Sequence, residues 1–434
     1  MQKTMIAIVA LVAASPALWA AHPKPTPTPR DTAVYQPKYN DPVLKEIEAR
    51  DKERDAKATA ETDAIRERQK QQQEADGKAE TVLRFDMSRI EKPASPAAFK
   101  PAWHFPPVAQ YLTGTCWSFS TTSFYESEIH RLTGREVKLS EIWTVYWEYV
   151  EKMRRFVRER GDSLVDEGSE SNALPRIWKA YGIVPEQAYG GVLSPDGRHD
   201  HSRLIARLHE LCDWLKANEL WDEPLVVRMT RAILDEELGA PPTEVTWEGK
   251  TYSPREFLAD VVRLNLDDYV ELMSTSSLPF YTTGEYKVPD NWWHDANYVN
   301  VPLDEWYGSL VRALQQGYTV AIGGDVSEPG LNGFEDAAVI PSFDIPQEYI
   351  NQDSREFRFY NQTSTDDHGI HAVGLTRTPD GHDWFLIKDS ARSSRWGKFE
   401  GYYFFRDDFV KLKMLTYTVH RSAIPDLLAK VKSR

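Results

Sequence analysis

Apolar residues recur with two different periods along the chain, and the change between them divides it into two parts. After Cys116, the large apolar residues Tyr125, Ile129 and Leu132 stand at helical spacing until Gly134, which predicts a helix from Cys116 to about Thr133. In the last third, the short apolar runs "YTVAIGG", "HAVGLTR", "DWFLIKDS" and "GYYFF" are separated by turn residues, as is typical of strands. A helix-rich first half and a strand-rich second half predict an α+β fold of two lobes with a cleft between them.

Residues 82–434 carry these patterns and are expected to form the folded domain. Within them, "HSRLIARLHELCDWLKAN" and "SPREFLADVVRLNLDDYVELM" predict a helical insertion over about residues 195–285. Residues 41–80 are instead rich in charged residues, Gln and Ala, and are expected to be a solvated helix or a disordered arm. We favour a spacer over a pro-segment or a docking helix for this arm, because its large apolar residues are few. They are Val43, Leu44, Ile47 and Ile65.

The N-terminus has the pattern of a secretory signal peptide over residues 1–20. Lys3 supplies positive charge, an apolar run follows it, and Ala20 is a small residue suited to cleavage. The run is shorter than the roughly 20 residues that cross a bilayer, so no membrane span is expected after cleavage. We therefore predict an exported protein, periplasmic or secreted, whose residues 21–40 form a proline-rich linker.

Composition excludes some functions and leaves others open. The net charge of −14 argues against nucleic acid as a partner. The two cysteines, Cys116 and Cys212, could form one disulfide; alternatively, Cys212 is a half-buried structural thiol in a helix and Cys116 is free. Two groups of residues could suggest a metal: His199, Asp200 and His201 in what looks like a surface loop, and Asp366, His368 and His371. We expect no metal and no cofactor, because other interpretations use more of the sequence.

The position of Cys116 is suited to a nucleophile. A thiol in the first turn of a helix is near unpaired N–H groups and the positive end of the helix dipole, which favour the thiolate. His368 opens one predicted strand and Asp389 closes the next, and the turn "TPDGHD" joins the two strands as a hairpin. The hairpin allows a carboxylate to approach an imidazole, so the sequence holds a base and an orienting group for the thiol.

Three motifs give the chain a resemblance to the papain-like cysteine peptidases. Gln110 stands six residues before Cys116 in "QYLTGTCW", "DHGIHAVG" matches the motif of the family's histidine, and "KDSA" stands where the family has Lys-Asn-Ser-Trp. By this register His368 is the base and His371 is not. The inserted helices and the segment "YGIVPE" look most like the bleomycin hydrolase or aminopeptidase C branch.

The resemblance implies a two-lobed fold, with a helical lobe whose central helix starts at the nucleophile and a β-rich lobe. It implies that Cys116 attacks a peptide carbonyl, His368 transfers the proton, and Asp389 orients His368. Gln110 and the backbone N–H of Cys116 would stabilise the oxyanion. The residues that would bind the substrate are Gly168, Ser169 and Trp117.

Substrates would be peptides or proteins, and the choice between trimming amino termini and cutting internally stays open. Proteins of the bleomycin hydrolase branch form hexamers and place a C-terminal arm in the cleft. Here only "SAIPDLLAKVKSR" follows the last strand, which favours the absence of that arm and leaves a homo-oligomer as one possibility.

Three positions depart from the family pattern. Asp389 replaces an asparagine, Ala391 replaces a tryptophan that shields the histidine from water, and Ser169 replaces a glycine, which would narrow the pocket. Unless Trp396 or Trp384 fills the space at Ala391, we expect a wetter and weaker bond between His368 and its partner. These departures keep two alternatives open: a weak or inactive peptide-binding protein on the same scaffold, and a cysteine amidase or acyltransferase.

Overall fold

The computed structural model describes residues 35–79 and 81–431, and the chain divides into one unit before residue 82 and one from residue 82 onward. The predicted signal peptide over residues 1–20 lies outside the described residues, as does most of the linker. Residues 35–40 of that linker are exposed and have no regular structure. Among the helices that the structure describes, none combines the length and the apolar composition needed to cross a membrane.

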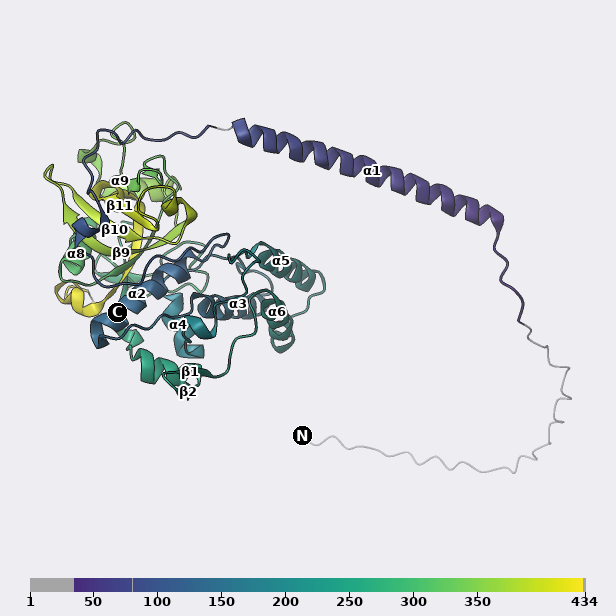
Figure 1. The fold of residues 1–434 in the computed structure, drawn as a ribbon, viewed down its shortest axis with the longest axis horizontal. Helices are drawn as coiled ribbons and strands as arrows, with labels where there is room; N and C mark the ends of the chain where they lie inside the picture. Colours follow the sequence, from purple (N-terminus) through teal and green to yellow (C-terminus); the bar gives the residue numbers. More distant parts are fainter. Residues whose placement is uncertain (1–34, 80, 432–434) are drawn as a thin grey trace, which may run out of the picture. The chain divides into compact units, whose positions relative to one another are not determined.

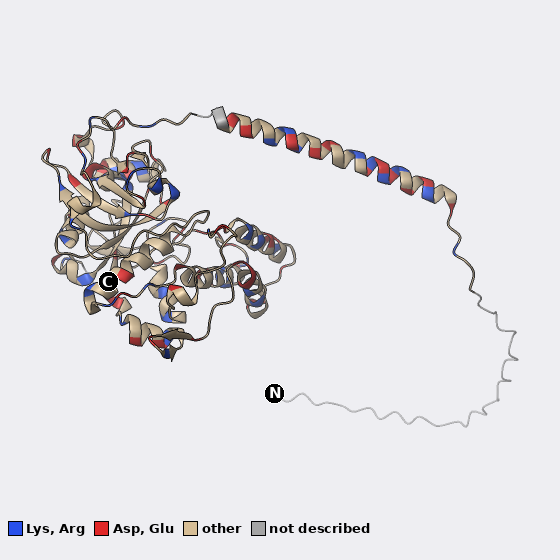
Figure 2. Cartoon of the chain, in the orientation of Figure 1, with Lys and Arg blue, Asp and Glu red and all other residues tan. Residues whose placement is uncertain are grey.

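The charged arm is a single helix, α1 (Pro42–Ala79). Acidic and basic residues alternate along its whole length (Figure 2), and hydrogen bonds such as Gln71 Nε2 to Glu67 Oε1 (3.1 Å) join successive turns. Such pairs stabilise a helix locally, whereas this helix has no apolar stripe that packing could bury. Its large apolar residues are all exposed: Val43, Leu44, Ile47 and Ile65.

The helical lobe of the second unit is built around α2 (Cys116–Thr133), which has the predicted bounds. Gly134 ends it in the left-handed conformation with φ 70°, which glycine adopts without strain. The helix that follows is capped by Ser140, whose side chain accepts a hydrogen bond from the Trp143 N–H. The other long helices of this lobe are α3 (Glu141–Arg158), α4 (Ala173–Tyr181), α5 (Ser202–Ala217) and α6 (Glu223–Glu237).

The β-rich lobe contains one mixed sheet of ten described strands. Its core is made by apolar side chains of the central strands and of α8 (Leu303–Gln315), including the fully buried Trp306. Helix α2 packs on β9 and β6 on one side and on α3 and α4 on the other, so it joins the two lobes (Figure 1). In spatial order the strands are β4 (Thr282–Gly284), β5 (Tyr298–Asn300), β3 (Tyr269–Met273), β12 (Met414–His420), β6 (Val320–Gly324), β9 (His368–Arg377), β10 (Asp383–Lys388), β11 (Tyr402–Arg406), β8 (Ala337–Ala338) and β7 (Leu331–Asn332).

The predicted helical insertion is correct only in its first half. Helices α5 and α6 occupy residues 202–237, but a small hairpin of β1 (Val245–Trp247) and β2 (Lys250–Tyr252) follows. The segment "SPREFLADVV" forms short helical turns that end at Arg263 with φ 56°, and residues 269–273 are strand β3. Strand β3 is buried between β12 and β5, and this long-range pairing outweighs the local helical spacing.

Short elements complete the second unit. The segment between α1 and α2 contains one short 3-10 turn, η1 (Pro96–Phe99). The remaining short helices are α7 (Pro254–Glu256), η2 (Glu186–Ala188), η3 (Phe257–Val262), η4 (Leu266–Asp268), η5 (Gln347–Tyr349), α9 (Gln352–Tyr360), η6 (Arg392–Arg395), α10 (Asp407–Lys413), η7 (Arg421–Ala423) and α11 (Pro425–Leu428).

The segment after β12 packs against the β-rich lobe. Ile424 and Leu427 are buried in the same core as α8, and Lys430 Nζ forms an ion pair with Glu305 on α8 at 2.5 Å. The described residues of this segment, 421–431, therefore do not form an arm that lies in the cleft.

Candidate active site

Cys116 is a free, half-buried thiol at the first position of α2. Its backbone N–H has no acceptor within the helix, because the first N–H groups of any helix lack one. Cys212 is also free; it is buried on α5 with its Sγ 3.6 Å from Met153 Sδ. The disulfide alternative is therefore wrong for this structure, and burial raises the pKa of the Cys212 thiol to about 12.

His368 and Asp389 form the pair that the hairpin predicted. His368 is the first residue of β9, Asp389 directly follows β10, and Nε2 of the histidine lies 3.0 Å from Oδ2 of the aspartate. Cys116 and His368 line the same cavity, and the thiol acts on the imidazole electrostatically. Burial alone would lower the pKa of His368, but the charges of Asp389 and Cys116 outweigh it and hold this pKa well above its usual value.

His371 lies on the same strand but takes a different position. It is fully buried and pairs across the hairpin with Lys388; its Nδ1 is 2.8 Å from Ser123 Oγ, which also accepts a hydrogen bond from Lys388 Nζ. Burial and the charge of Lys388 keep the pKa of His371 well below the usual value, so the ring is neutral. The structure thus places His368, and not His371, beside the cysteine.

The segment around His199 and His201 is a surface loop, as predicted, with Asp200 exposed and His199 half-buried. His201 is the exception at only 2% exposed. The backbone of Leu112 bonds both to the His199 carbonyl (3.2 Å) and to the His201 N–H (3.1 Å), and this pairing holds the loop against the chain before Cys116. Burial, with a contribution from His199, lowers the pKa of His201 to about 4. Across the residues with described positions, no group of His, Cys, Asp and Glu is arranged to hold a metal ion.

Gln110 is held beside the nucleophile by hydrogen bonds on both ends of its amide. Its Oε1 accepts from Ser390 Oγ (2.6 Å) and its Nε2 donates to the Thr113 carbonyl (2.7 Å). The backbone N–H of Gln110 also donates to the Ser390 carbonyl (3.0 Å). One N–H of the amide stays available, so this amide and the N–H of Cys116 are the donors that an oxyanion could use.

The three residues expected to bind the substrate lie in different settings. Trp117 and Ser169 line the cavity that contains Cys116 and His368. The Trp117 indole donates to the Glu167 carbonyl (3.0 Å), and the Ser169 hydroxyl donates to Glu148 Oε1 (2.7 Å). Gly168 is not among the lining residues; its carbonyl accepts a hydrogen bond from Lys152 Nζ, and a side chain at this position would collide with Asp290. A direct role for Gly168 stays a prediction.

The loss of the family tryptophan at Ala391 does not expose the pair formed by His368 and Asp389. Their side chains are 8% and 2% exposed, so the expected wetter bond is wrong. Neither suggested tryptophan fills the space: Trp384 is buried in a separate core cluster, and Trp396 is 46% exposed. Instead, the Arg395 guanidinium donates to the Ala391 carbonyl (2.9 Å) and, more weakly, to that of Asp389 (3.4 Å).

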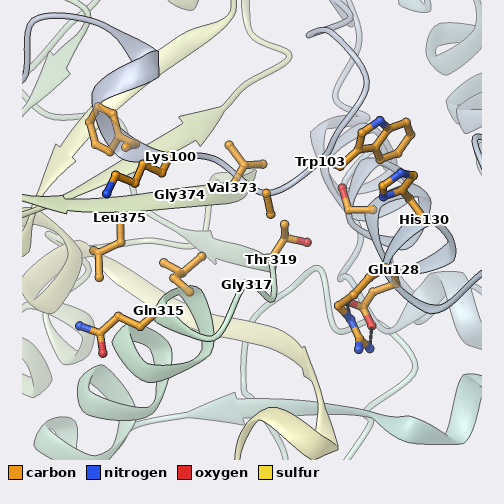
Figure 3. Close-up of a pocket in the computed structure, with 15 residues that line it drawn as sticks. Lys100, Trp103, Glu128, His130, Gln315, Gly317, Thr319, Val373, Gly374 and Leu375 are labelled. Carbon is orange, nitrogen blue, oxygen red and sulfur yellow. Dashed lines mark hydrogen bonds and ion pairs between the residues drawn. The ribbon is translucent and has the colours of Figure 1, made fainter. Parts of the chain in front are cut away.

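A larger cavity of about 400 Å³ lies at the other end of α2 (Figure 3). His130 lines it and stacks on Trp103 with ring centres 4.2 Å apart. Since a helix rises 1.5 Å per residue, Glu128 in this cavity is about 18 Å along the axis from Cys116. This cavity contains no part of the pair or the thiol, so we assign it no chemistry.

Sequence reasoning missed a group of carboxylates in the small cavity beside Cys116. Glu170, Asp290 and Asp366 line it, together with Asp367 and His368. Asp366 stands two residues before the base His368 in "DDHG". From the sequence alone, this residue suggested only part of a possible metal site. Asp290 is 120 residues from Glu170 and 76 residues from Asp366 in the chain, so no sequence spacing could have placed it here.

The chain is similar to one known protein family and to several solved structures. The model of the Peptidase C1-like family matches residues 97–433. Among solved structures, PepW from Lactobacillus rhamnosis HN001 is similar at 18% identity and a TM-score of 0.62, covering 78% of this chain and 84% of PepW. A digestive procathepsin L 3 of Tenebrio molitor larval midgut matches at 16% identity over 77% of this chain and 73% of its own, with a TM-score of only 0.34.

No curated protein sequence matches the chain. The likeness to PepW supports the fold alone, because the identity is low. The family match, in contrast, spans most of the chain and includes the cysteine, the histidine and the aspartate. The chain therefore belongs to the Peptidase C1-like family and is a cysteine-type peptidase with the two-lobed papain-like fold.

Proposed function

We propose that this protein is an exported cysteine peptidase that hydrolyses peptide bonds with Cys116, His368, Asp389 and Gln110. The observation that carries the proposal is the 3.0 Å contact between His368 Nε2 and Asp389 Oδ2, whose side chains are almost fully buried, with the Cys116 thiol in the same cavity as His368. This arrangement keeps the imidazole protonated and oriented toward the sulfur, as thiolate chemistry requires.

In the proposed mechanism the Cys116 thiolate attacks the carbonyl carbon of the scissile bond. The negative charge that develops on the carbonyl oxygen is stabilised by the Cys116 N–H and the free N–H of Gln110. The His368 imidazolium gives its proton to the leaving amine, and a thioester remains on the sulfur. Water then attacks the thioester while His368 accepts a proton from it, which releases the carboxylic acid and restores the ion pair.

Asp389 acts on His368 and not on the substrate. Its carboxylate accepts the Nε2–H, which fixes the tautomer and stabilises the imidazolium. The carboxylate is itself held by the Ala391 N–H at 2.5 Å from Oδ1. Because Asp389 is charged and buried, we expect it to replace the family's asparagine without loss of catalysis.

Export is proposed from the signal-peptide pattern of residues 1–20. A fusion of residues 1–21 to a reporter that is active only outside the cytoplasm tests it. We expect the reporter to be active, and to become inactive when charges are placed within the apolar run. Activity that survives this change would contradict export by a signal peptide.

Hydrolysis is tested with the purified chain and a mixture of peptides, with the products identified by mass spectrometry. We expect the wild-type protein and Cys212→Ala to cleave peptides, and Cys116→Ala to be inactive although folded. Cleavage by Cys116→Ala would refute the proposal. Failure of the wild-type protein on all peptides would favour the binding scaffold, and release of amide products from cell-wall fragments alone would favour an amidase.

A further inference from the structure

The small cavity beside the nucleophile is lined by acids and by no lysine or arginine among the described residues. Glu170, Asp290 and Asp366 are among the lining residues, and His368 is the only basic residue in the lining. Asp367 also lines the cavity, but its carboxylate accepts hydrogen bonds from the Val326 N–H and the Ser327 hydroxyl. Burial, together with the charge of the neighbouring Asp366, raises the pKa of Glu170 well above its usual value, so Glu170 keeps a proton in the free enzyme. Like charges this close repel unless a proton or a cation lies between them.

Glu170 has one carboxyl oxygen that lacks a partner. The residue is only 4% exposed, and its Oε1 has no hydrogen-bond partner in the described structure. A buried carboxylate oxygen left in this state costs free energy, so buried carboxylates normally have a donor or a positive charge beside them. Lys152, the nearest buried lysine, acts on Asp290, and it already donates to the carbonyls of Asp166 and Gly168.

The size of the cavity limits what the missing partner can be. Its volume is about 30 Å³, against the roughly 10–15 Å³ that a cavity needs to hold one water molecule, so it has room only for a small group. An ammonium group has this size and offers three donors, whereas an apolar side chain would leave the carboxylates buried and unpaired. A group on a bound substrate could reach this position, because Cys116 lines the same cavity.

We propose that Glu170, Asp366 and Asp290 form a subsite for an ammonium group of the substrate, so that the enzyme prefers peptides with a positive charge next to the scissile bond. The group is either the free α-amine at the start of a peptide or the side chain of a basic residue. The substrate class rests on the proposed peptidase function; the cation site itself does not. In the first case the enzyme removes residues from amino termini, and in the second it cuts beside lysine within a chain.

The cation site is tested without any peptide by alkylthiolation of Cys116 in the full chain. The rates with 2-aminoethyl and 2-sulfonatoethyl methanethiosulfonate, a cation and an anion, are measured by peptide mass spectrometry at about 0.15 M salt, where long-range charge effects are screened. Each rate is divided by that of a free cysteine derivative. We expect a cation-to-anion ratio of about tenfold, which falls at least about threefold in Glu170→Gln.

Asp366→Asn is a second variant at a less buried position and should lower the ratio in the same way. Glu244→Gln removes an exposed charge outside the cavity and should leave the ratio unchanged. A wild-type ratio near one, or a ratio that neither cavity variant lowers, overturns the cation site whether or not the protein cleaves peptides.

The substrate class is tested with four amides that differ in one group each. These are a dipeptide amide with a free amine, its acetylated form, and acetylated dipeptide amides that begin with lysine or with its uncharged analogue norleucine. A loss of kcat/KM on acetylation of the first pair assigns the site to the α-amine, and a preference for lysine over norleucine assigns it to the side chain. Equal rates within both pairs overturn the substrate preference. Cationic reagent preference without any hydrolysis would leave the cation site in place and refute the proposed function.

Discussion

Replacement of Asp389 by asparagine tests how the site holds its proton. The amide oxygen of asparagine can accept the same Nε2–H of His368, but it lacks the negative charge. An opposite charge this close to a titratable group shifts its pKa by about 1–3 units, and one unit corresponds to about 1.4 kcal/mol. Because both side chains are almost fully buried, water does not screen this interaction. We therefore expect a loss of about 1.4 kcal/mol, which lowers the pKa of His368 by roughly one unit.

The direction in which the His368 pKa moves in Asp389→Asn follows from how its neighbours shift this pKa in the wild-type site. Burial lowers the pKa of His368, and Asp389 and Cys116 raise it above its usual value. Removal of the aspartate charge must therefore lower it, so the imidazolium is lost at a lower pH. The pH at which peptidase activity falls on the alkaline side should move down by the same roughly one unit.

The assay is an NMR titration of protein labelled at the histidine ring carbons. His368 is assigned by the signal that is absent in His368→Gln. Asp383→Asn serves as the control. Asp383 begins strand β10, which Asp389 directly follows, but its carboxylate accepts a hydrogen bond from the Tyr307 hydroxyl (2.9 Å) and not from His368. A His368 pKa that is unchanged in Asp389→Asn, or one that falls equally in Asp383→Asn, would refute the role assigned to the aspartate charge.

Three further predictions concern the site and its support. Gln110→Ala should lower kcat by about 10²- to 10³-fold with little change in KM, since an oxyanion donor acts in the transition state; an unchanged kcat in steady-state kinetics would remove the amide from the mechanism. Gly369→Ala should lower kcat/KM about tenfold without loss of folding. The added carbon would lie 3.1 Å from the Trp117 backbone and would push the start of β9 away from α2. Unchanged kinetics would show that catalysis does not require the close packing of β9 on α2. Arg355→Met should lower the melting temperature by roughly 4 °C, because the buried guanidinium donates to four backbone carbonyls, including that of Leu415; calorimetry that shows no change would contradict it.

The sequence predicted well those features that depend on neighbouring residues. Helix α2 has the expected bounds, because its apolar spacing and Gly134 are local signals. The hairpin of β9 and β10 likewise follows from two strand-like runs and a turn, and it brings His368 to Asp389. The choice of His368 over His371 came from a family motif, and the geometry of the site agrees with it.

Features that depend on distant residues could not be predicted. Residues 269–273 had helical spacing, but pairing with β12 makes them a strand. His201 stands in a polar segment, yet backbone pairing with Leu112 buries it. Asp290 lines the cavity from a loop far along the chain. The group of acids beside Cys116 could therefore be recognised only once the fold was known.

The central claim is that Cys116 forms an ion pair with His368, and alkylation of the thiol tests it most directly. The rate of reaction with iodoacetamide is followed against pH by peptide mass spectrometry, with the buried Cys212 as the internal control and His368→Ala alongside. The account predicts rapid alkylation of Cys116 at about pH 5.5, where an ordinary thiol is protonated, and loss of this advantage in His368→Ala. A Cys116 that reacts no faster than an ordinary thiol at that pH, or equally fast without His368, would contradict the account.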